Sequence, residues 1–324
     1  MTMQIDELYK AIDDLSMEGG WHRKAPALWP EPRANFIPKV WHYADVRPIL
    51  EEAGHLVDHR MADRRNPTLT NPVEGNLYAT VRTLVAAYQS IKPGETADAH
   101  RHTPNALRII IDGLGTYTVV NGTRVEMRPG DVLLTPSWNW HSHEAVGPDE
   151  CFWVDVLDVP TVHLLESMFF ERHPDKLEKN VVNMSREECP LAFRWEDSVK
   201  RLDAQTQAPA HGTAEREIEL TSKSGGPAMK TVAIYVQRMG KGFVSRPWRT
   251  TSNAVFTVLE GAGTTRVGVK GQEKELKWER GDIIAVPTWQ PYQHIVTKDA
   301  HLVRVCDEPV MRAFDMLRSV PAEL

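Results

Sequence analysis

The chain has 324 residues and a formal net charge of −6, with 41% of its residues hydrophobic and 25% charged. This length suits about two domains of a globular protein. The charge balance and the lack of a Lys/Arg-rich block argue against nucleic acid or an anionic membrane as the main partner.

Nothing in the sequence predicts export or membrane insertion. No apolar run approaches the ~18–20 residues of a membrane-spanning helix, and residues 1–16 lack the basic and apolar regions of a signal peptide. The cysteines Cys151, Cys189 and Cys306 lie far apart and form no CxxC pair. We therefore expect a cytoplasmic protein with reduced thiols, in which each cysteine is a small buried apolar residue.

The N-terminal segment, residues 1–76, combines helical and extended patterns. Apolar residues at helical spacing predict helices over 5–15 and 46–53. Prolines are frequent over residues 25–40, which favours an extended path across a surface. We expect this segment to precede the first β domain.

From residue 77 the pattern changes to short apolar runs separated by Gly, Pro or Asn-Gly. Asn121-Gly122 is a strong hairpin-turn signal. Evenly spaced short strands predict a sandwich or barrel over residues 77–160. The predicted strands are 84–91, 107–112, 116–120, 132–135 and 151–157.

The next part of the chain, residues 161–224, reads as a helical and loop connection. Within it we expect helices over 164–171 and 195–204. The β pattern then returns over 225–310, and a helix is expected over 311–324. The predicted fold class is all-β with added helices.

The second β region repeats the first in sequence. Residues that recur at corresponding places are Gln89 and Gln237, Gly94 and Gly242, Asn105 and Asn253, Gly113 and Gly261, Trp138 and Trp289, and His143 and His294. A repeat of this length indicates two copies of one domain. The recurring glycines imply that the same turns are used twice.

The repeat fails at the residues best suited to chemistry. The second copy has Trp248 for His100, Thr250 for His102, Tyr292 for His141 and Phe256 for Arg108. Purely structural histidines would be expected to persist in part. The first copy therefore reads as the site and the second as scaffold.

Three histidines of the first copy form the candidate metal site. His100 and His102 point to the same side of a strand because side chains alternate, and a β-barrel lets His141 join them from a later strand. Neutral imidazoles suit Fe, Zn, Cu or Ni, and three protein ligands leave room for a substrate and a co-substrate such as O2. Taken alone, the His100–His102 pair is also compatible with two surface or core histidines.

The spacing around these histidines resembles the two motifs of the cupin superfamily. The chain reads G-x5-H-x-H-x10-G from Gly94 to Gly113, then G-x5-P-x-W-x2-H from Gly130 to His141. The resemblance implies a bicupin of two jelly-roll β-barrels. Cupins usually place a Glu ligand where this chain has Ala106, so a three-His site is implied, unlike that of manganese oxalate enzymes.

Longer stretches resemble the gentisate 1,2-dioxygenase family, which includes salicylate and 1-hydroxy-2-naphthoate dioxygenases. They include His100-Arg101-His102-Thr103, Ala106-Leu107-Arg108, Pro136 to His143, Trp153-Val154-Asp155 and Cys306-Asp307-Glu308-Pro309. The resemblance implies one Fe(II) per chain and a homo-oligomer, with a tetramer favoured. It also implies that O2 is used to open an ortho-hydroxylated aromatic acid between the carboxyl-bearing and adjacent hydroxyl-bearing carbons.

Arginines are the expected partners of the substrate carboxylate. Arg108 follows His102 by six residues, and we assign both to one strand and one inward face. An Arg fork matches a carboxylate bidentately, whereas an Arg on an edge strand would project to solvent. By resemblance a second arginine reaches the site, and we favour Arg64, with Arg65 as the surface alternative.

The remaining site residues are expected from strand parity or from the resemblance. His143 shares the parity of His141 and is a candidate to hydrogen-bond the substrate hydroxyl or a bound oxygen. His294 persists in the second copy, so a structural role for His143 stays open. By resemblance, Asp155 orients a ligand or a substrate-contacting group, although an acid capping a turn near a strand end would look the same.

Substrate selectivity is expected to depend on Val85 and Gln89. The family often has Trp four residues before the Gln that corresponds to Gln89, and here that position is Val85. The smaller residue leaves space for gentisate, for a 5-substituted salicylate such as 5-nitrosalicylate, or for an unsubstituted or fused ring. Two other readings remain: a different three-His cupin oxygenase, and a non-enzymatic metal- or ligand-binding bicupin.

Overall fold

The computed structural model describes residues 4–22, 27–57 and 64–324. The chain divides into two units, residues 1–33 and 34–324. Helix α1 (Ile5–Asp14) forms the regular part of the first unit, as its apolar spacing predicted, and none of its residues is buried. No helix in the described ranges is long and apolar enough to cross a membrane.

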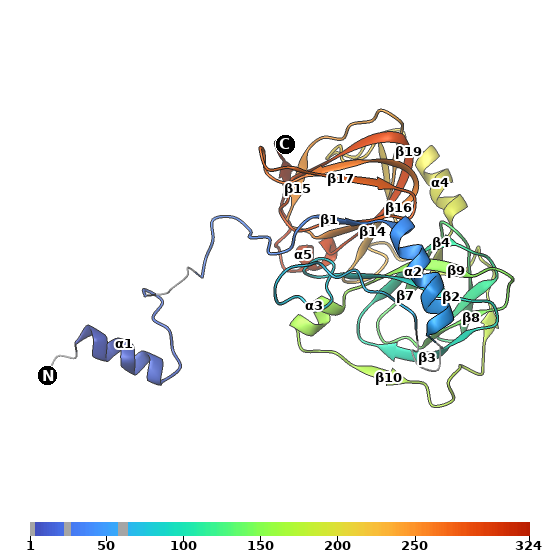
Figure 1. Cartoon of the computed structure of the whole chain (residues 1–324), viewed down its shortest axis with the longest axis horizontal. Coiled ribbons are helices and arrows are strands. Elements are labelled where there is room, and N and C mark those ends of the chain that lie inside the picture. Colours follow the sequence, from blue (N-terminus) through green and yellow to red (C-terminus); the bar gives the residue numbers. More distant parts are fainter. Residues whose placement is uncertain (1–3, 23–26, 58–63) are drawn as a thin grey trace. The chain divides into compact units, whose positions relative to one another are not determined.

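The second unit begins with a strand and a helix that belong to different β domains. Strand β1 (Lys39–Trp41) pairs with β18 (Ile283–Val286) in the second copy. Helix α2 (Tyr43–Leu56) then packs beside β2 (Val85–Ile91) of the first copy (Figure 1). The predicted helix over 46–53 is confirmed, but the crossing to the second copy had no signal in the local sequence.

The first copy consists of two facing sheets of the cupin type, jelly-roll-like but not closed into a barrel. All strands predicted between residues 84 and 157 are confirmed. The six-stranded sheet has the order β10 (Phe170–Arg172), β3 (Thr96–His102), β8 (His141–Ala145), β5 (Thr116–Val120), β6 (Thr123–Met127) and β11 (Val182–Asn183). The five-stranded sheet has the order β12 (Ala192–Phe193), β7 (Val132–Thr135), β4 (Ala106–Asp112), β9 (Cys151–Leu157) and β2 (Val85–Ile91).

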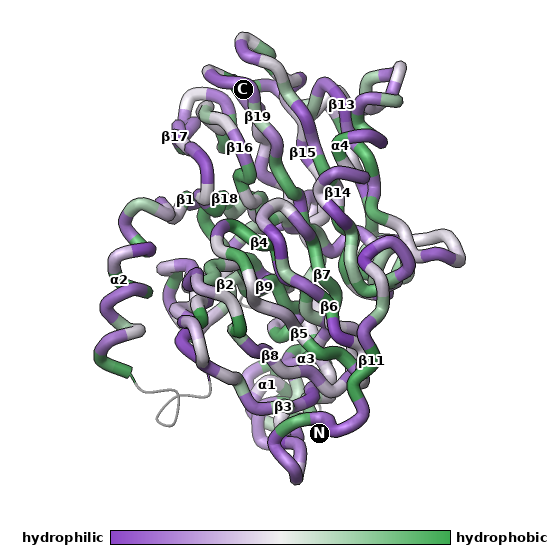
Figure 2. The backbone as a smooth tube through the Cα atoms, turned by 90° about the vertical axis from the view of Figure 1, so that its right-hand side faces the viewer, coloured by the Kyte–Doolittle hydropathy of each residue, from purple (hydrophilic) through white to green (hydrophobic). Residues whose placement is uncertain are grey.

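Both faces of the five-stranded sheet are buried. Its inner face carries Ile110 and Trp153 into the space between the two sheets. Its outer face carries Tyr88 and Ile109 against the second copy, in a core that also contains Val303. Because water reaches neither face, these strands read as continuous apolar runs rather than alternating ones, and Figure 2 shows hydrophobic residues along the central strands.

The second copy forms a nine-stranded sheet around two long, bent strands. Its central order is β1, β18, β16, β19, β14 and β13, with β15, β17 and β20 attached. The bounds are β13 (Arg216–Glu219), β14 (Ala233–Met239), β15 (Trp248–Thr250), β16 (Ala254–Val267), β17 (Lys274–Glu279), β19 (Tyr292–Cys306) and β20 (Ser319–Pro321). The expectation of an all-β bicupin is confirmed, but the sheets are jelly-roll-like and are not the closed barrels that were expected. Cys151, Cys189 and Cys306 are buried free thiols.

Two predicted helices were wrong. In place of a helix over 164–171, helix α3 (Val159–Leu164) ends early and strand β10 follows. In place of a helix over 311–324, helix α5 (Glu308–Ala313) is followed by strand β20. In both cases the chain pairs with an open strand edge, β3 or β15, and this pairing overrides local helical preference.

These two corrections show that the repeat is longer than the sequence suggested. Each copy ends in a short helix, a residue of positive φ and a return strand. Glu166 has φ 53° after α3, and Asp315 has φ 55° after α5. The helix predicted over 195–204 is confirmed as α4 (Trp195–Asp203) and lies between the copies in sequence.

Candidate metal centre

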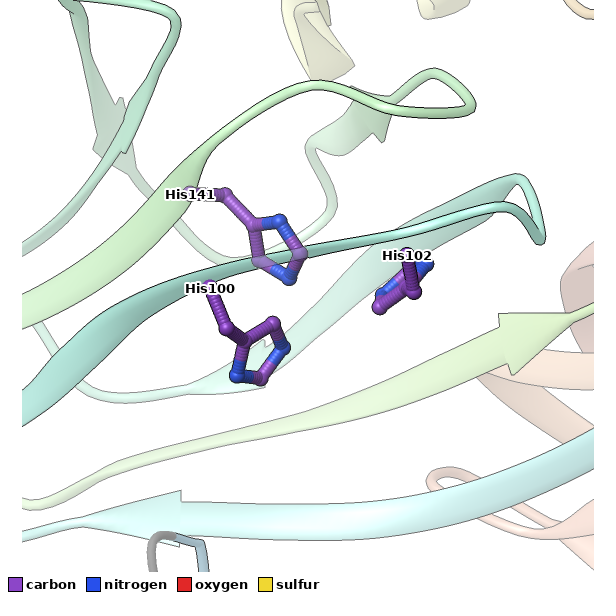
Figure 3. Close-up of side chains that lie close together, drawn as sticks. All are labelled: His100, His102 and His141. Atoms are coloured by element: carbon purple, nitrogen blue, oxygen red, sulfur yellow. The ribbon is translucent and has the colours of Figure 1, made fainter. Parts of the chain in front are cut away.

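Three histidines meet between the sheets of the first copy. His100 and His102 come from β3, and His141 comes from β8 directly opposite His100 in the ladder. One ligand nitrogen from each lies within 4.8 Å of the other two, and Figure 3 shows their rings around one common space. They are the single such group of metal-ligating side chains among the described residues.

Main-chain carbonyls fix two of these rings. The Nδ1 of His102 lies 2.8 Å from the carbonyl oxygen of Pro104, and the Nδ1 of His141 lies 3.1 Å from that of Asn139. A carbonyl only accepts, so each Nδ1 carries the proton and each Nε2 keeps its lone pair for a cation. Both rings are therefore held in the form that ligates.

The third ring has a different partner. The Nδ1 of His100 lies 2.7 Å from Nη1 of Arg64. A guanidinium only donates, so this contact uses the lone pair of a neutral imidazole, which has one lone pair. His100 can thus accept from Arg64 or ligate a cation through that lone pair, but it cannot do both at once.

Burial keeps the histidines neutral. It lowers the pKa of His102 to about 4, with a further contribution from the charge of Arg108. It holds the pKa of His100 and of His141 well below the usual histidine range, and nearby arginines act in the same direction. The ligand set is therefore deprotonated at neutral pH, as metal binding requires.

Arg108 approaches from the sheet opposite His100 and His102. The expectation that it shares a strand with His102 was wrong, because the chain turns after β3 and Arg108 lies on β4. Its side chain still faces inward and is 3% exposed, with Nη1 donating to Oγ1 of Thr135 over 2.6 Å. Because side chains of both sheets face inward, residues from different strands meet at one site.

Asp155 is the buried counter-charge of Arg108. The two residues lie opposite each other in the ladder of β4 and β9, with 3.2 Å between Nε and Oδ1. The indole of Trp153 donates to the other carboxylate oxygen over 3.0 Å. Burial raises the pKa of Asp155, and the charge of Arg108 offsets part of that rise.

The two neighbouring arginines of the N-terminal segment point to different places. Arg64 contacts His100, and its Nη2 donates to the carbonyl oxygen of Asp98 over 3.4 Å. The alternative placed Arg65 at the surface, but Arg65 is only 7% exposed. Its guanidinium pairs bidentately with the carboxylate of Glu95. Adjacent residues of an extended chain face opposite ways, so one arginine reaches the histidines and the other does not.

His143 lies deeper in the same space. It is fully buried, and its ring centroid is 6.3 Å from that of His141. Neither ring nitrogen has a hydrogen-bond partner among the described residues. His294 in the second copy instead has Oγ1 of Thr265 2.8 Å from its Nδ1. The two recurring histidines therefore occupy different polar environments, and burial together with Arg108 lowers the pKa of His143.

Val85 and Gln89 lie on the inner face of β2. Gln89 is opposite Trp153, and its side-chain oxygen has no partner within the described ranges. Val85 is opposite Leu157 and buried. Both face the side of the sheet that carries Arg108 and Asp155.

Sequence reasoning missed Phe170 and Arg172 on β10. Phe170 lies opposite His102 in the ladder, and its ring centroid is 5.1 Å from that of His100. Arg172 lies opposite His100 and contributes to lowering its pKa. No local pattern in the sequence marks this three-residue strand, which is defined by its pairing with β3.

The second copy fills the corresponding space with side chains. Tyr292 and Phe256 are buried there with ring centroids 5.8 Å apart. Its buried arginine, Arg304, lies opposite Phe256 and pairs with Glu308 over 2.8 Å and Glu217 over 3.5 Å. A buried cation neutralised by two acids is not available to a ligand carboxylate.

Comparison with known proteins adds the following. The cupin domain model matches residues 87–157. Gentisate 1,2-dioxygenase 1 of Aquipseudomonas alcaligenes is 30% identical, over 95% of this chain and 93% of its own. 5-Aminosalicylate 1,2-dioxygenase of Comamonas sp is 31% identical, over 97% and 89%. The structure of salicylate 1,2-dioxygenase from Pseudoaminobacter salicylatoxidans with gentisate is 29% identical, covers 100% and 95%, and has a TM-score of 0.89.

Proposed function

The chain belongs to the gentisate and salicylate 1,2-dioxygenase family of ring-cleaving enzymes, and we propose that it opens an ortho-hydroxylated aromatic acid with Fe(II) and O2. The bond cleaved joins the carboxyl-bearing carbon to the adjacent hydroxyl-bearing carbon. The observation that carries the proposal is a set of three neutral imidazoles facing a buried arginine.

The donor set fits a divalent transition metal. His100, His102 and His141 would hold it, and Ala106 stands where a carboxylate ligand would change the charge of the site. Bound Fe(II) supplies a redox-active template on which O2 and the aromatic acid meet. The iron assignment rests on the family and on imidazole ligands, which suit Fe among other metals.

The arginines select a carboxylated substrate. Arg108 stays charged although buried, because Asp155 stabilises it, and it presents a fixed fork to the substrate carboxylate. If His100 ligates a metal through its lone pair, Arg64 would serve as a second donor to the substrate carboxylate. Desolvation makes these charged hydrogen bonds stronger than they would be in water.

The ring nitrogens of His143 and the side-chain oxygen of Gln89 have no hydrogen-bond partner among the residues that the structure describes. Both are buried beside Arg108 on the inner faces of the sheets. A substrate hydroxyl or a bound oxygen satisfies them, and this supports a binding role for His143 over a structural one. Val85 is smaller than the Trp that the family often has at this position, so gentisate and 5-substituted salicylates such as 5-nitrosalicylate are the proposed substrates.

The test combines metal analysis with O2 uptake. The protein is measured with gentisate, salicylate, 5-nitrosalicylate, 5-chlorosalicylate and 1-hydroxy-2-naphthoate, before and after chelation and with iron restored. We expect iron-dependent uptake with at least one acid and loss of both iron and uptake in His100→Ala. Iron binding without uptake on any acid would favour a metal-binding bicupin. Uptake only on substrates without a carboxylate would favour another three-His oxygenase.

A further inference from the structure

The residue between the two histidine ligands of β3 points away from them. Arg101 lies on the outer face, where its guanidinium is sandwiched 4.4 Å from the ring centroid of Trp138 and 4.5 Å from that of Trp140. Its Nε and Nη2 donate to one carboxylate oxygen of Glu171 over 2.8 and 2.6 Å. The two indole rings thus hold the guanidinium in the orientation in which it contacts the carboxylate of Glu171.

Glu171 lies in the middle of strand β10, directly opposite Arg101. Its neighbours Phe170 and Arg172 face the other side because side chains alternate, which places them beside His102 and His100. The ring of Phe170 is 5.1 Å from that of His100. The outer ion pair and the inner aromatic contact therefore share one short strand.

Strand β10 is a short strand at the edge of its sheet. It spans Phe170–Arg172, forms the edge of its sheet, and all three of its residues are exposed. Main-chain bonds tie it to β3 at both ends, from Thr103 N to Phe169 O and from His173 N to Ala99 O, over 3.0 and 2.9 Å. A short exposed edge strand is among the least stable parts of a fold, so a side-chain clamp changes its position more than it would in a core strand.

Comparison with the second copy shows which of these contacts belong to the fold shared by both copies. Strand β20 pairs with β15 as β10 pairs with β3, and Arg249 lies 4.5 Å from the ring centroid of Trp289. Opposite Arg249 the residue is Val320, where the first copy has Glu171. Phe170 and Arg172 likewise correspond to Ser319 and Pro321. The contact between arginine and tryptophan recurs, whereas the residues of β10 differ from those of β20 at all three positions.

We propose that Arg101 and Glu171 are positioning residues, which clamp β10 from outside so that Phe170 and Arg172 form a fixed wall of the substrate pocket. This proposal rests on the proposed function, because the wall formed by Phe170 and Arg172 would face the aromatic acid. Neither residue touches the substrate, so the clamp sets the width of the slot for the ring. Loosening it costs substrate affinity rather than iron or the chemical step.

The test compares Arg101→Gln and Glu171→Gln with the matched variant Arg249→Gln of the second copy. Substrate affinity is measured by calorimetry on the iron-loaded protein without O2, and KM and kcat are measured in air. We expect Kd and KM to rise about three- to tenfold in the first two variants. Their kcat and iron content should stay within about twofold of the parent, and Arg249→Gln should leave Kd and KM unchanged. Equal rises in KM for Arg101→Gln and Arg249→Gln would overturn the clamp.

A double-mutant cycle tests whether the ion pair of Arg101 and Glu171 affects KM through Phe170. Phe170→Ala should raise KM by itself, and adding Glu171→Gln to it should raise KM little further, because the wall is already lost. Fully additive effects would contradict the proposal. A parent protein inactive on every acid would refute the proposed function instead, whereas an active parent with unchanged KM in Glu171→Gln refutes the clamp alone.

Discussion

At the scale of single residues, the site depends on the partners of its arginines. Arg108 and Asp155 neutralise each other, and Arg64 occupies the lone pair of His100. The choice of three histidines and one arginine could be predicted from sequence, because the second copy loses all four. The contact between Arg64 and His100 could not, because it joins residues that no local pattern relates.

Arg64→Ala separates metal binding from substrate binding. The variant removes a cation that lowers the pKa of His100 and competes for its lone pair. We expect iron binding to be unchanged or tighter. We expect KM to rise about tenfold or more, because the substrate loses one charged hydrogen bond. Metal titration and steady-state kinetics check this. Weaker iron binding with a parent-like KM would contradict the role given to Arg64.

Arg108→Gln should both destabilise the protein and impair substrate use. Removing one partner of a buried ion pair leaves Asp155 charged and unpaired, at a cost of about 3–5 kcal/mol. Adding Asp155→Asn removes that charge, so the double variant should recover much of the lost Tm without recovering substrate affinity. Thermal unfolding and KM are the measurements, and a double variant with parent-like KM would exclude Arg108 as the carboxylate partner.

The neutral histidines predict acid sensitivity of the metal-free protein. The folded-state pKa of His102 is about 4, whereas a histidine in an unfolded chain titrates near about 6.5. Between these values the unfolded chain binds more protons, so the free energy of unfolding falls as pH falls, by up to about 1.4 kcal/mol per pH unit for this group. Asp131, with its pKa raised to about 6, acts in the opposite direction.

A matched variant isolates the histidine contribution. His102→Gln removes one such group, so its chelator-treated Tm should fall less than that of the parent between neutral pH and about pH 5. Thermal unfolding across this range checks the difference. Parallel Tm curves for the two proteins would show that His102 is not held neutral by the fold.

At the scale of elements, strand pairing decided what local patterns left open. Strands β2, β4, β7 and β9 of the five-stranded sheet were predictable because both of their faces are buried and their apolar runs are continuous. Strands β10 and β20 were not, because each is three residues long, exposed, and stabilised by a neighbouring edge. The part of the site that sequence missed, Phe170 and Arg172, lies on one of these return strands.

The inner face of β2 offers a test of selectivity. Val85→Trp places a large ring on the face that also carries Gln89. We expect the ratio of kcat/KM for gentisate to that for 1-hydroxy-2-naphthoate to rise about tenfold or more, because the fused ring loses space while the smaller ring gains a stacking partner. A ratio that stays at the parent value would place the specificity pocket elsewhere.

At the scale of the whole molecule, one frame is used twice and only one copy is equipped for chemistry. The outer sheet faces of the two copies bury each other in a shared core. The second copy fills its interior with Phe256 and Tyr292 and neutralises Arg304 internally. The duplication could be predicted from recurring turns and tryptophans, but its full length, including the helix and return strand of each copy, needed the structure.

We propose that both atoms of O2 enter the aromatic acid as its ring is opened at the three-histidine site. The most direct measurement is mass spectrometry of the product formed under isotopically labelled O2 with iron-loaded protein and the best acid of the panel. We predict a ring-opened product carrying two labelled oxygen atoms, and no product from the chelated protein. A product without labelled oxygen, or equal turnover after iron removal, would contradict the proposed reaction.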